Sequence, residues 1–129
     1  MSGHTVLYDP DGRIEAQLPL DRTTHQSLVK AVLAWHGDPG LQAADYQQIA
    51  LQLTGAARSV ATDVRRAADC LPECRAARVL AEYVLNDADQ RLAVPLAGTA
   101  DCTQDRARIV RALYERLDRL TELVPAATS

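Results

Sequence analysis

Aromatic and sulfur-containing core residues are scarce in this chain, which has no phenylalanine, one tryptophan and one methionine. Tyrosine and aliphatic side chains must therefore supply most of any core. The length of 129 residues is typical of one domain. No uncharged apolar run approaches the roughly 18 residues that span a membrane, and no basic and apolar leader opens the chain. These absences predict a cytoplasmic protein with no membrane segment.

An excess of positive charge is also missing. The chain has 14 basic and 17 acidic residues and a formal net charge of −3, so it lacks the basic field that dominates binding to phosphate backbones. Nucleic acid is therefore a disfavoured partner, and a DNA-binding regulator would need a dimer that presents two copies of the last helix. The odd number of cysteines, three, indicates reduced thiols.

Sequence motifs that carry catalysis are absent as well. There is no Walker loop, dinucleotide-binding glycine motif, helical Glu-x-x-His pair or nucleophile elbow. No catalytic residue, cofactor or metal is therefore predicted. Cys70 and Cys74 are four residues apart, and three interpretations stay open for them: free thiols, a disulfide, or two thiolate ligands of a metal.

Residues 1–20 are predicted to form a short β-hairpin arm that packs on the rest of the chain. The segment Asp9-Pro10-Asp11-Gly12 lies between two short apolar runs, and proline and glycine in this arrangement are typical of a tight turn. The helical domain is predicted over residues 21–124, and residues 125–129 are predicted to form a disordered tail.

Residues 22–36 and 41–71 are predicted to form the first two helices. Asp21 is the expected N-cap of the first helix, and the breaker residues Gly37-Asp38-Pro39-Gly40 separate the two. Steps of three and four residues place one apolar stripe along the second helix. This stripe consists of Tyr46, Ile49, Leu53, Ala56, Val60, Val64, Ala67 and Leu71.

Two further helices are predicted after Pro72, which ends the second helix and is expected in the first turn of the third. Asp101 and Gln104 resemble a capping box that opens the fourth helix. The buried stripe of the third helix is predicted at Ala77, Leu80, Val84, Ala88 and Leu92. The apolar side of the fourth is predicted at Ile109, Leu113, Leu117, Leu120 and Val124.

The predicted fold is mainly α, an antiparallel up-and-down bundle of three to four helices with the short N-terminal β-hairpin. At about 1.5 Å per residue, the 41–71 helix is about 45 Å long and extends beyond what the first helix can cover. Its uncovered apolar surface predicts a homodimer or another protein partner.

Three tyrosines are candidate ligand-binding residues because one lies on each of the second, third and fourth predicted helices. These residues, Tyr46, Tyr83 and Tyr114, either converge on a pocket between the helices or supply the aromatic core volume that phenylalanine does not.

Trp35 and two histidines near it are further candidate ligand-binding residues. His25 and His36 are eleven residues apart, which returns a helix to nearly the same face. His25 also follows Asp21 by one helical turn, where a carboxylate can orient an imidazole. Alternatively, both histidines are solvated or cap a helix.

Charged residues on the predicted helices indicate solvated ion pairs and one arginine-rich face. Pairs four residues apart, such as Arg78 with Glu82 and Asp87 with Arg91, are typical of exposed helix surfaces. The fourth helix presents an arginine-rich face suited to an acidic partner, although interleaved acidic residues dilute it. Its members are Arg106, Arg108, Arg111, Arg116 and Arg119.

Packing and turn positions along the chain carry a resemblance to a known family. They are Leu51-Gln52-Leu53, Gly55, Val60, Asp63, Val64, Leu71-Pro72, Ala81-Glu82 and Arg91-Leu92. On these residues, most of the chain after the hairpin resembles short actinobacterial proteins of unknown function, often labelled as natural-product biosynthesis proteins. Members of that family often have a Gly-His pair where this chain has Gly55-Ala56. The resemblance implies a setting in specialised metabolism and supplies no catalytic residues.

Two functional hypotheses follow from these patterns. The first is a noncatalytic or accessory helical-bundle protein in specialised metabolism that acts through an oligomeric or partner-binding surface. The alternative is a small cofactor-independent enzyme or a small-molecule-binding protein, with a pocket between helices lined by the candidate tyrosines and histidines.

Overall fold

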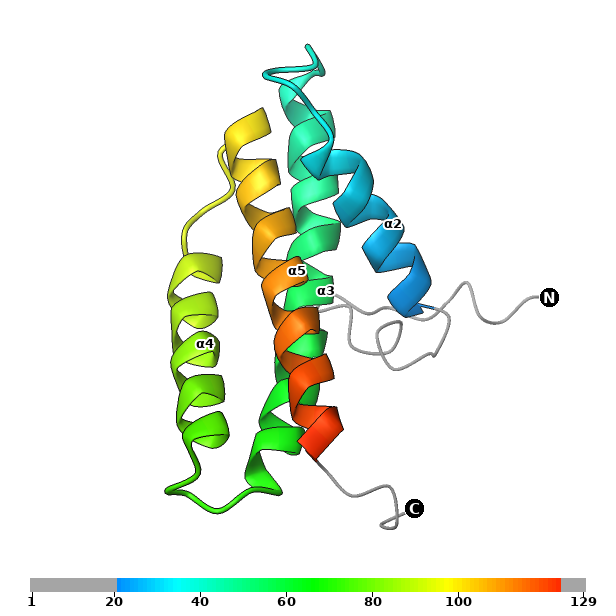
Figure 1. Cartoon of the computed structure of the whole chain (residues 1–129). Helices are drawn as coiled ribbons and strands as arrows, with labels where there is room; N and C mark the ends of the chain where they lie inside the picture. Colours follow the sequence, from blue (N-terminus) through cyan, green and yellow to red (C-terminus); the bar gives the residue numbers. More distant parts are fainter. Residues whose placement is uncertain (1–20, 124–129) are drawn as a thin grey trace, which may run out of the picture.

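The computed structural model describes residues 21–123, which form four helices (Figure 1). These are α2 (Asp21–Leu33), α3 (Ala43–Asp69), α4 (Ala76–Leu92) and α5 (Ala100–Leu123). This part of the chain is 78% helical and contains no strand, which confirms the mainly α prediction. The predicted hairpin over residues 1–20 and the predicted tail lie outside the described residues, as does the side chain of Asp21.

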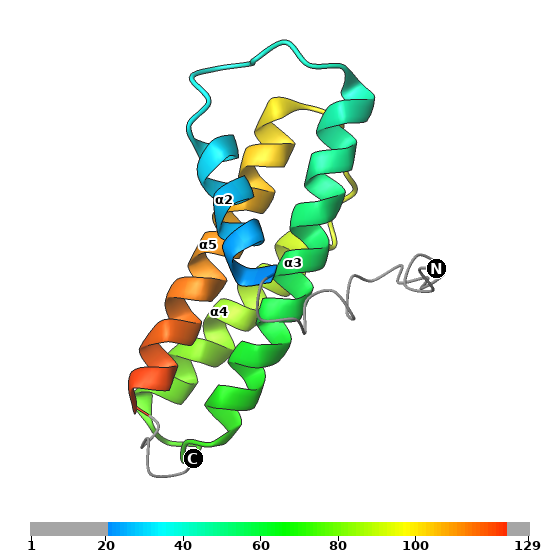
Figure 2. The same cartoon turned by 90° about the vertical axis from the view of Figure 1, so that its right-hand side faces the viewer.

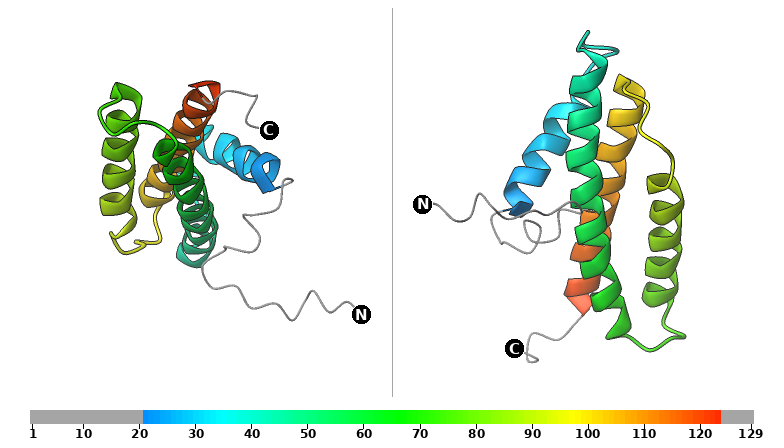
Figure 3. Two further views of the ribbon diagram at one scale, coloured as in Figure 1. Left: turned by 90° about the horizontal axis from the view of Figure 1, so that it is seen from below. Right: turned by 180° about the vertical axis from the view of Figure 1, so that it is seen from behind.

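The helices alternate in direction, so that each described helix runs antiparallel to the next (Figures 1 and 2). The central pair is α3 and α5, which lie side by side and run in the same direction. Figure 3 shows α2 on one side of this pair and α4 on the other, and the two flanking helices do not touch. The Thr103 hydroxyl donates a hydrogen bond of 3.2 Å to the Tyr46 carbonyl and joins the first turns of the central pair.

The core lies along the contact between α3 and α5. The predicted stripe of α3 is buried at Leu53, Ala56, Val60 and Val64. The prediction that this stripe has an uncovered apolar surface is wrong. The helix α5 has 24 residues, nearly as many as the 27 of α3, and it covers the stripe along most of the length of α3. The buried residues that α5 contributes are Ala107, Ile109, Val110, Leu113, Tyr114 and Leu120.

The face that α4 buries is shifted from the predicted one. Leu80 is 44% exposed, and the buried residues of the helix are Ala81, Leu85, Ala88 and Leu92. The small side chains of Ala81 and Ala88 let α4 approach the central pair closely. Val79, Leu80 and Tyr83 are on the outward side of the helix. The helix also begins at Ala76 rather than at Pro72.

The first turn of α5 is capped by Thr99, whose hydroxyl accepts a 3.1 Å hydrogen bond from the Cys102 backbone N–H. The predicted capping box is therefore wrong. The Gln104 side chain instead donates to the carbonyls of Val32 at 3.1 Å and Trp35 at 3.3 Å. These acceptors belong to the C-terminal end of α2 and the residues after it, where helical carbonyls lack partners within their own helix.

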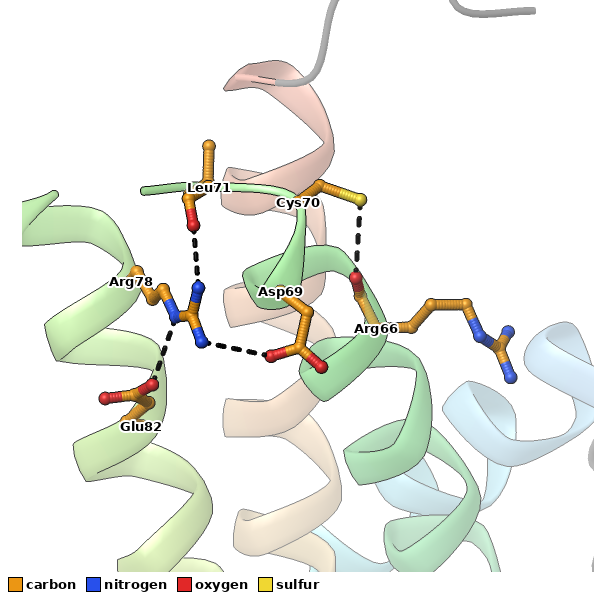
Figure 4. Close-up of polar contacts among 6 residues, drawn as sticks. All are labelled: Arg66, Asp69, Cys70, Leu71, Arg78 and Glu82. Atoms are coloured by element: carbon orange, nitrogen blue, oxygen red, sulfur yellow. Dashed lines mark hydrogen bonds and ion pairs between the residues drawn. The ribbon is translucent and has the colours of Figure 1, made fainter. Parts of the chain in front are cut away.

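Arg78 holds the turn between α3 and α4 (Figure 4). Its guanidinium donates to the Leu71 carbonyl at 2.8 Å, to Asp69 at 3.5 Å and to Glu82 at 3.1 Å. The predicted pair of Arg78 with Glu82 is thus confirmed, and the same side chain also satisfies a backbone carbonyl of the turn. Cys70 lies beside this cluster, with its Sγ 3.5 Å from the Arg66 carbonyl oxygen.

Arg106 holds the connection between α4 and α5. Its guanidinium donates to the Arg91 carbonyl at 3.2 Å and also to the Val94 carbonyl. The residue is only 2% exposed, so its predicted place on an arginine-rich surface is wrong. Arg106 points inward because the last turn of α4 and the residues after it leave carbonyl groups that need donors.

Candidate functional site

A pocket of about 460 Å³ lies between α2 and α5, a volume within the usual range of small-molecule sites. We call it the α2–α5 pocket. It combines an aliphatic wall on α2 with charged side chains from both helices. The lining residues are Gln26, Val29, Lys30 and Leu33 of α2, Ala34 directly after that helix, and Arg111, Tyr114, Glu115 and Asp118 of α5.

Tyr114 is held in place at the pocket by two residues of α2. The Arg22 guanidinium carbon lies 4.6 Å from the centroid of the Tyr114 ring, a distance typical of a cation–π contact. His25 Nδ1 lies 3.2 Å from the Tyr114 hydroxyl oxygen. Arg22 Nη2 also donates to both carboxylate oxygens of Asp118 at 2.8 Å. The charge of Asp118 is consequently paired with that of Arg22 at the protein surface.

The other three charged groups of the pocket differ from Asp118 because they form no ion pair with the described residues. Lys30, Arg111 and Glu115 are exposed, and no ion pair joins any of them to another residue in the range 22–123. The pocket therefore offers two cationic groups and one carboxylate to a ligand.

Tyr46 and Trp35 pack at the connection between α2 and α3 and do not line this pocket. The Tyr46 hydroxyl donates to the Asp38 carboxylate and accepts from the backbone N–H groups of Gly40 at 3.1 Å and Leu41 at 3.0 Å. The Trp35 and Tyr46 rings meet edge to face, with centroids 5.9 Å apart. Gly40 has a φ of 83°, in the left-handed region that favours glycine.

This connection is expected to make stability depend on pH at both extremes. The hydrogen bonds from Tyr46 and from the Gly40 N–H lower the pKa of Asp38 below 3.8. The stabilisation of the fold by the ionised carboxylate is therefore lost as the pH falls through that lowered value. Burial and the hydrogen bond to Asp38 raise the pKa of Tyr46 above 10.0. The stabilisation of the fold by the neutral hydroxyl is therefore lost as the pH rises through that raised value. Tyr46→Phe should weaken both dependences, measured by urea unfolding from acid to alkaline pH.

Tyr83→Phe is the matched control for this measurement, because Tyr83 is exposed and has no hydrogen bond among those of the described residues. This control should follow the wild-type profile at both extremes. Identical profiles for Tyr46→Phe and the wild-type protein would contradict the assignment.

The structure separates the predicted ligand residues. Tyr114 lines the α2–α5 pocket, whereas Tyr46 lies at the α2–α3 connection and Tyr83 is 72% exposed on α4. The predicted convergence of the three tyrosines is therefore wrong. His25 contacts Tyr114, but His36 is exposed and follows the end of α2. The two histidines do not share a helix face, because α2 ends at Leu33.

The charged residues of the pocket were not predicted as a site. A spacing signal was present, since Arg22, Gln26 and Lys30 are four apart on one helix, and Arg111 and Glu115 are four apart on another. Such spacing places each group on one face of its helix. It does not indicate that the two faces meet.

The described residues contain no group of three or more histidine, cysteine and acidic side chains placed to hold a metal ion. Cys70 and Cys74 are exposed and Cys102 is half-buried, all three as free thiols. Among the helices of residues 21–123, none is long and apolar enough to cross a membrane.

Comparisons with known proteins give no match to this chain, whether against protein-family models, curated proteins or solved structures.

Proposed function

We propose that the chain is a noncatalytic, accessory helical-bundle protein that acts through a surface of α4 and forms a homodimer there. The observation that carries this proposal is an apolar patch on that helix, composed of Val79, Leu80 and Tyr83. These side chains are 53%, 44% and 72% exposed. Adjacent apolar residues on the exposed side of a helix are typical of interaction surfaces, and tyrosine is frequent at the centre of such surfaces.

The order of residues on α4 favours a second copy of the chain as the partner. Val79, Tyr83 and Asp87 of α4 and its N-cap residue, Arg75, are spaced four apart and therefore follow one ridge of the helix surface. Two such ridges packed antiparallel about a twofold axis bring Val79 against Tyr83 of the other copy. The same arrangement brings Arg75 against Asp87, whose carboxylate also lies 3.4 Å from Arg91 Nη1 on its own helix, so that opposite charges flank the apolar contact on both sides.

Sedimentation velocity over a range of protein concentrations tests this proposal. The wild-type chain should form a dimer whose fraction rises with concentration, and Tyr83→Asp should be monomeric because it places a carboxylate in the apolar contact. Arg75→Asp and Asp87→Arg should each weaken the dimer by about tenfold, since each opposes like charges. The double variant with both changes should restore it.

Leu51→Asp is the control for this experiment, because Leu51 is 54% exposed on α3, outside the α4 patch. It should leave the dimer unchanged, and circular dichroism verifies that every variant is folded. A wild-type chain that is monomeric at all concentrations, or a double variant that does not recover, would contradict the proposed homodimer.

The proposed setting in bacterial specialised metabolism rests on the sequence resemblance to actinobacterial proteins. An accessory role agrees with the absence of catalytic motifs from the sequence.

A second candidate function is the binding of a small molecule. The observation that favours it is the α2–α5 pocket, which has the volume of a ligand site and combines an apolar wall with charged groups.

A further inference from the structure

We infer that the α2–α5 pocket binds a small zwitterion with an aliphatic tail, of the α-amino acid class. Lys30 and Arg111 hold its carboxylate, and Glu115 holds its ammonium group. This inference rests on the candidate function of small-molecule binding and is independent of the α4 surface.

The charges that line the pocket favour a ligand with both signs. Asp118 is occupied by Arg22, which donates to both of its oxygens at 2.8 Å. Lys30, Arg111 and Glu115 have no ion pair within residues 22–123. A simple anion would pair with the two cations and be repelled by Glu115. A simple amine would pair with Glu115 and be repelled by Lys30 and Arg111. A zwitterion pairs with all three groups.

The spacing of these groups suits charges that are close together in the ligand. Arg111 and Glu115 are four residues apart on α5, so their Cβ atoms are about 5–6 Å apart. An α-amino acid has its carboxylate and ammonium on one carbon atom, and flexible arginine and glutamate side chains can reach both from adjacent helix turns. Lys30 lines the same pocket from α2 and adds a second cation for the carboxylate.

The pocket also has room and apolar surface for a tail. Val29 and Leu33 of α2, with Ala34 directly after the helix, provide aliphatic side chains. A volume of about 460 Å³ exceeds what the charged head of an amino acid fills, so an aliphatic tail of several carbons would occupy the remainder and cover these side chains.

A matched panel of probes tests the inference on the full chain: 2-aminooctanoic acid, octanoate, octylamine and 1-octanol. Binding is measured at pH 7 by nuclear magnetic resonance titration. Lys30 is the only lysine of the chain, so reductive ¹³C-methylation, which preserves its charge, provides a single lysine signal at the pocket. We expect 2-aminooctanoic acid to shift this signal and to bind at least about tenfold more tightly than each other probe.

Substitutions assign the two charges of the ligand separately. Glu115→Gln should reduce the affinity for 2-aminooctanoic acid to that for octanoate, as read from backbone amide shifts. Combined Lys30→Gln and Arg111→Gln substitutions should reduce it to that for octylamine. Glu122→Gln and Arg108→Gln are the matched controls, because both residues are exposed on α5 and lie outside the pocket lining. The controls should leave the order of affinities unchanged.

The outcomes separate the inference from the candidate function on which it depends. Binding of octanoate, octylamine or octanol as tightly as 2-aminooctanoic acid would support a ligand site and overturn the zwitterion. The same conclusion would follow if Glu115→Gln left the preference intact. If no probe shifts the Lys30 signal or the amides of the lining residues, both the ligand class and the small-molecule function are overturned.

Discussion

Leu53→Ala is expected to lower the free energy of unfolding by about 3 kcal/mol, because leucine-to-alanine changes in a close-packed core cost about 2–5 kcal/mol. Leu53 is 0% exposed and belongs to the α3 stripe that packs on α5. Leu53 belongs to a buried cluster with residues of all four described helices, so the substitution leaves a cavity among closely packed side chains. Urea unfolding followed by circular dichroism measures the change.

Leu51→Ala is the control for this substitution. Leu51 is two residues away on the same helix and 54% exposed, so the same change in helix propensity occurs without a cavity. Its effect should remain below about 0.5 kcal/mol, as is usual for surface sites. Equal effects of the two substitutions would contradict the packing of α3 on α5.

Arg106→Met is expected to lower the free energy of unfolding by about 2 kcal/mol. The substitution removes hydrogen bonds from a charged donor to the carbonyls of Arg91 and Val94, and such bonds contribute about 1.5–3 kcal/mol each. The loss is smaller than the sum because methionine has no charge to desolvate. Arg106 forms no ion pair within residues 22–123.

Arg108→Met serves as the control, since Arg108 is exposed two positions further along α5. Its effect on urea unfolding should be within about 0.5 kcal/mol of zero. Arg106→Lys should lie between the wild-type chain and Arg106→Met, because an ammonium keeps the charge but not the planar fork that reaches two carbonyls. An Arg106→Met variant as stable as the wild-type chain would show that the guanidinium does not support the α4–α5 connection.

The candidate site was predicted only in part. The sequence groups His25 with His36 and Tyr114 with two other tyrosines as the lining of one pocket, but it does not predict the direct contact of His25 with Tyr114 across 89 positions. Lys30 and Glu115 were not selected, because an exposed charge on a helix has the same sequence pattern whether or not a pocket lies beside it. The placement of one tyrosine on each of three predicted helices likewise suggests a ligand role for Tyr46, whereas its hydroxyl forms hydrogen bonds within the α2–α3 connection.

The sequence by itself determined that the described part of the chain is helical, roughly where its helices lie and which stripes of α3 and α5 are apolar. These features depend on residues a few positions apart, so a period of 3.6 and the breaker residues suffice to predict them. Only the tertiary structure decided that α3 and α5 form a parallel central pair, that α4 turns Val79, Leu80 and Tyr83 outward, and that α2 meets α5 at a pocket. Those arrangements depend on how side chains from distant segments fit together, and that fit leaves no periodic pattern in the chain.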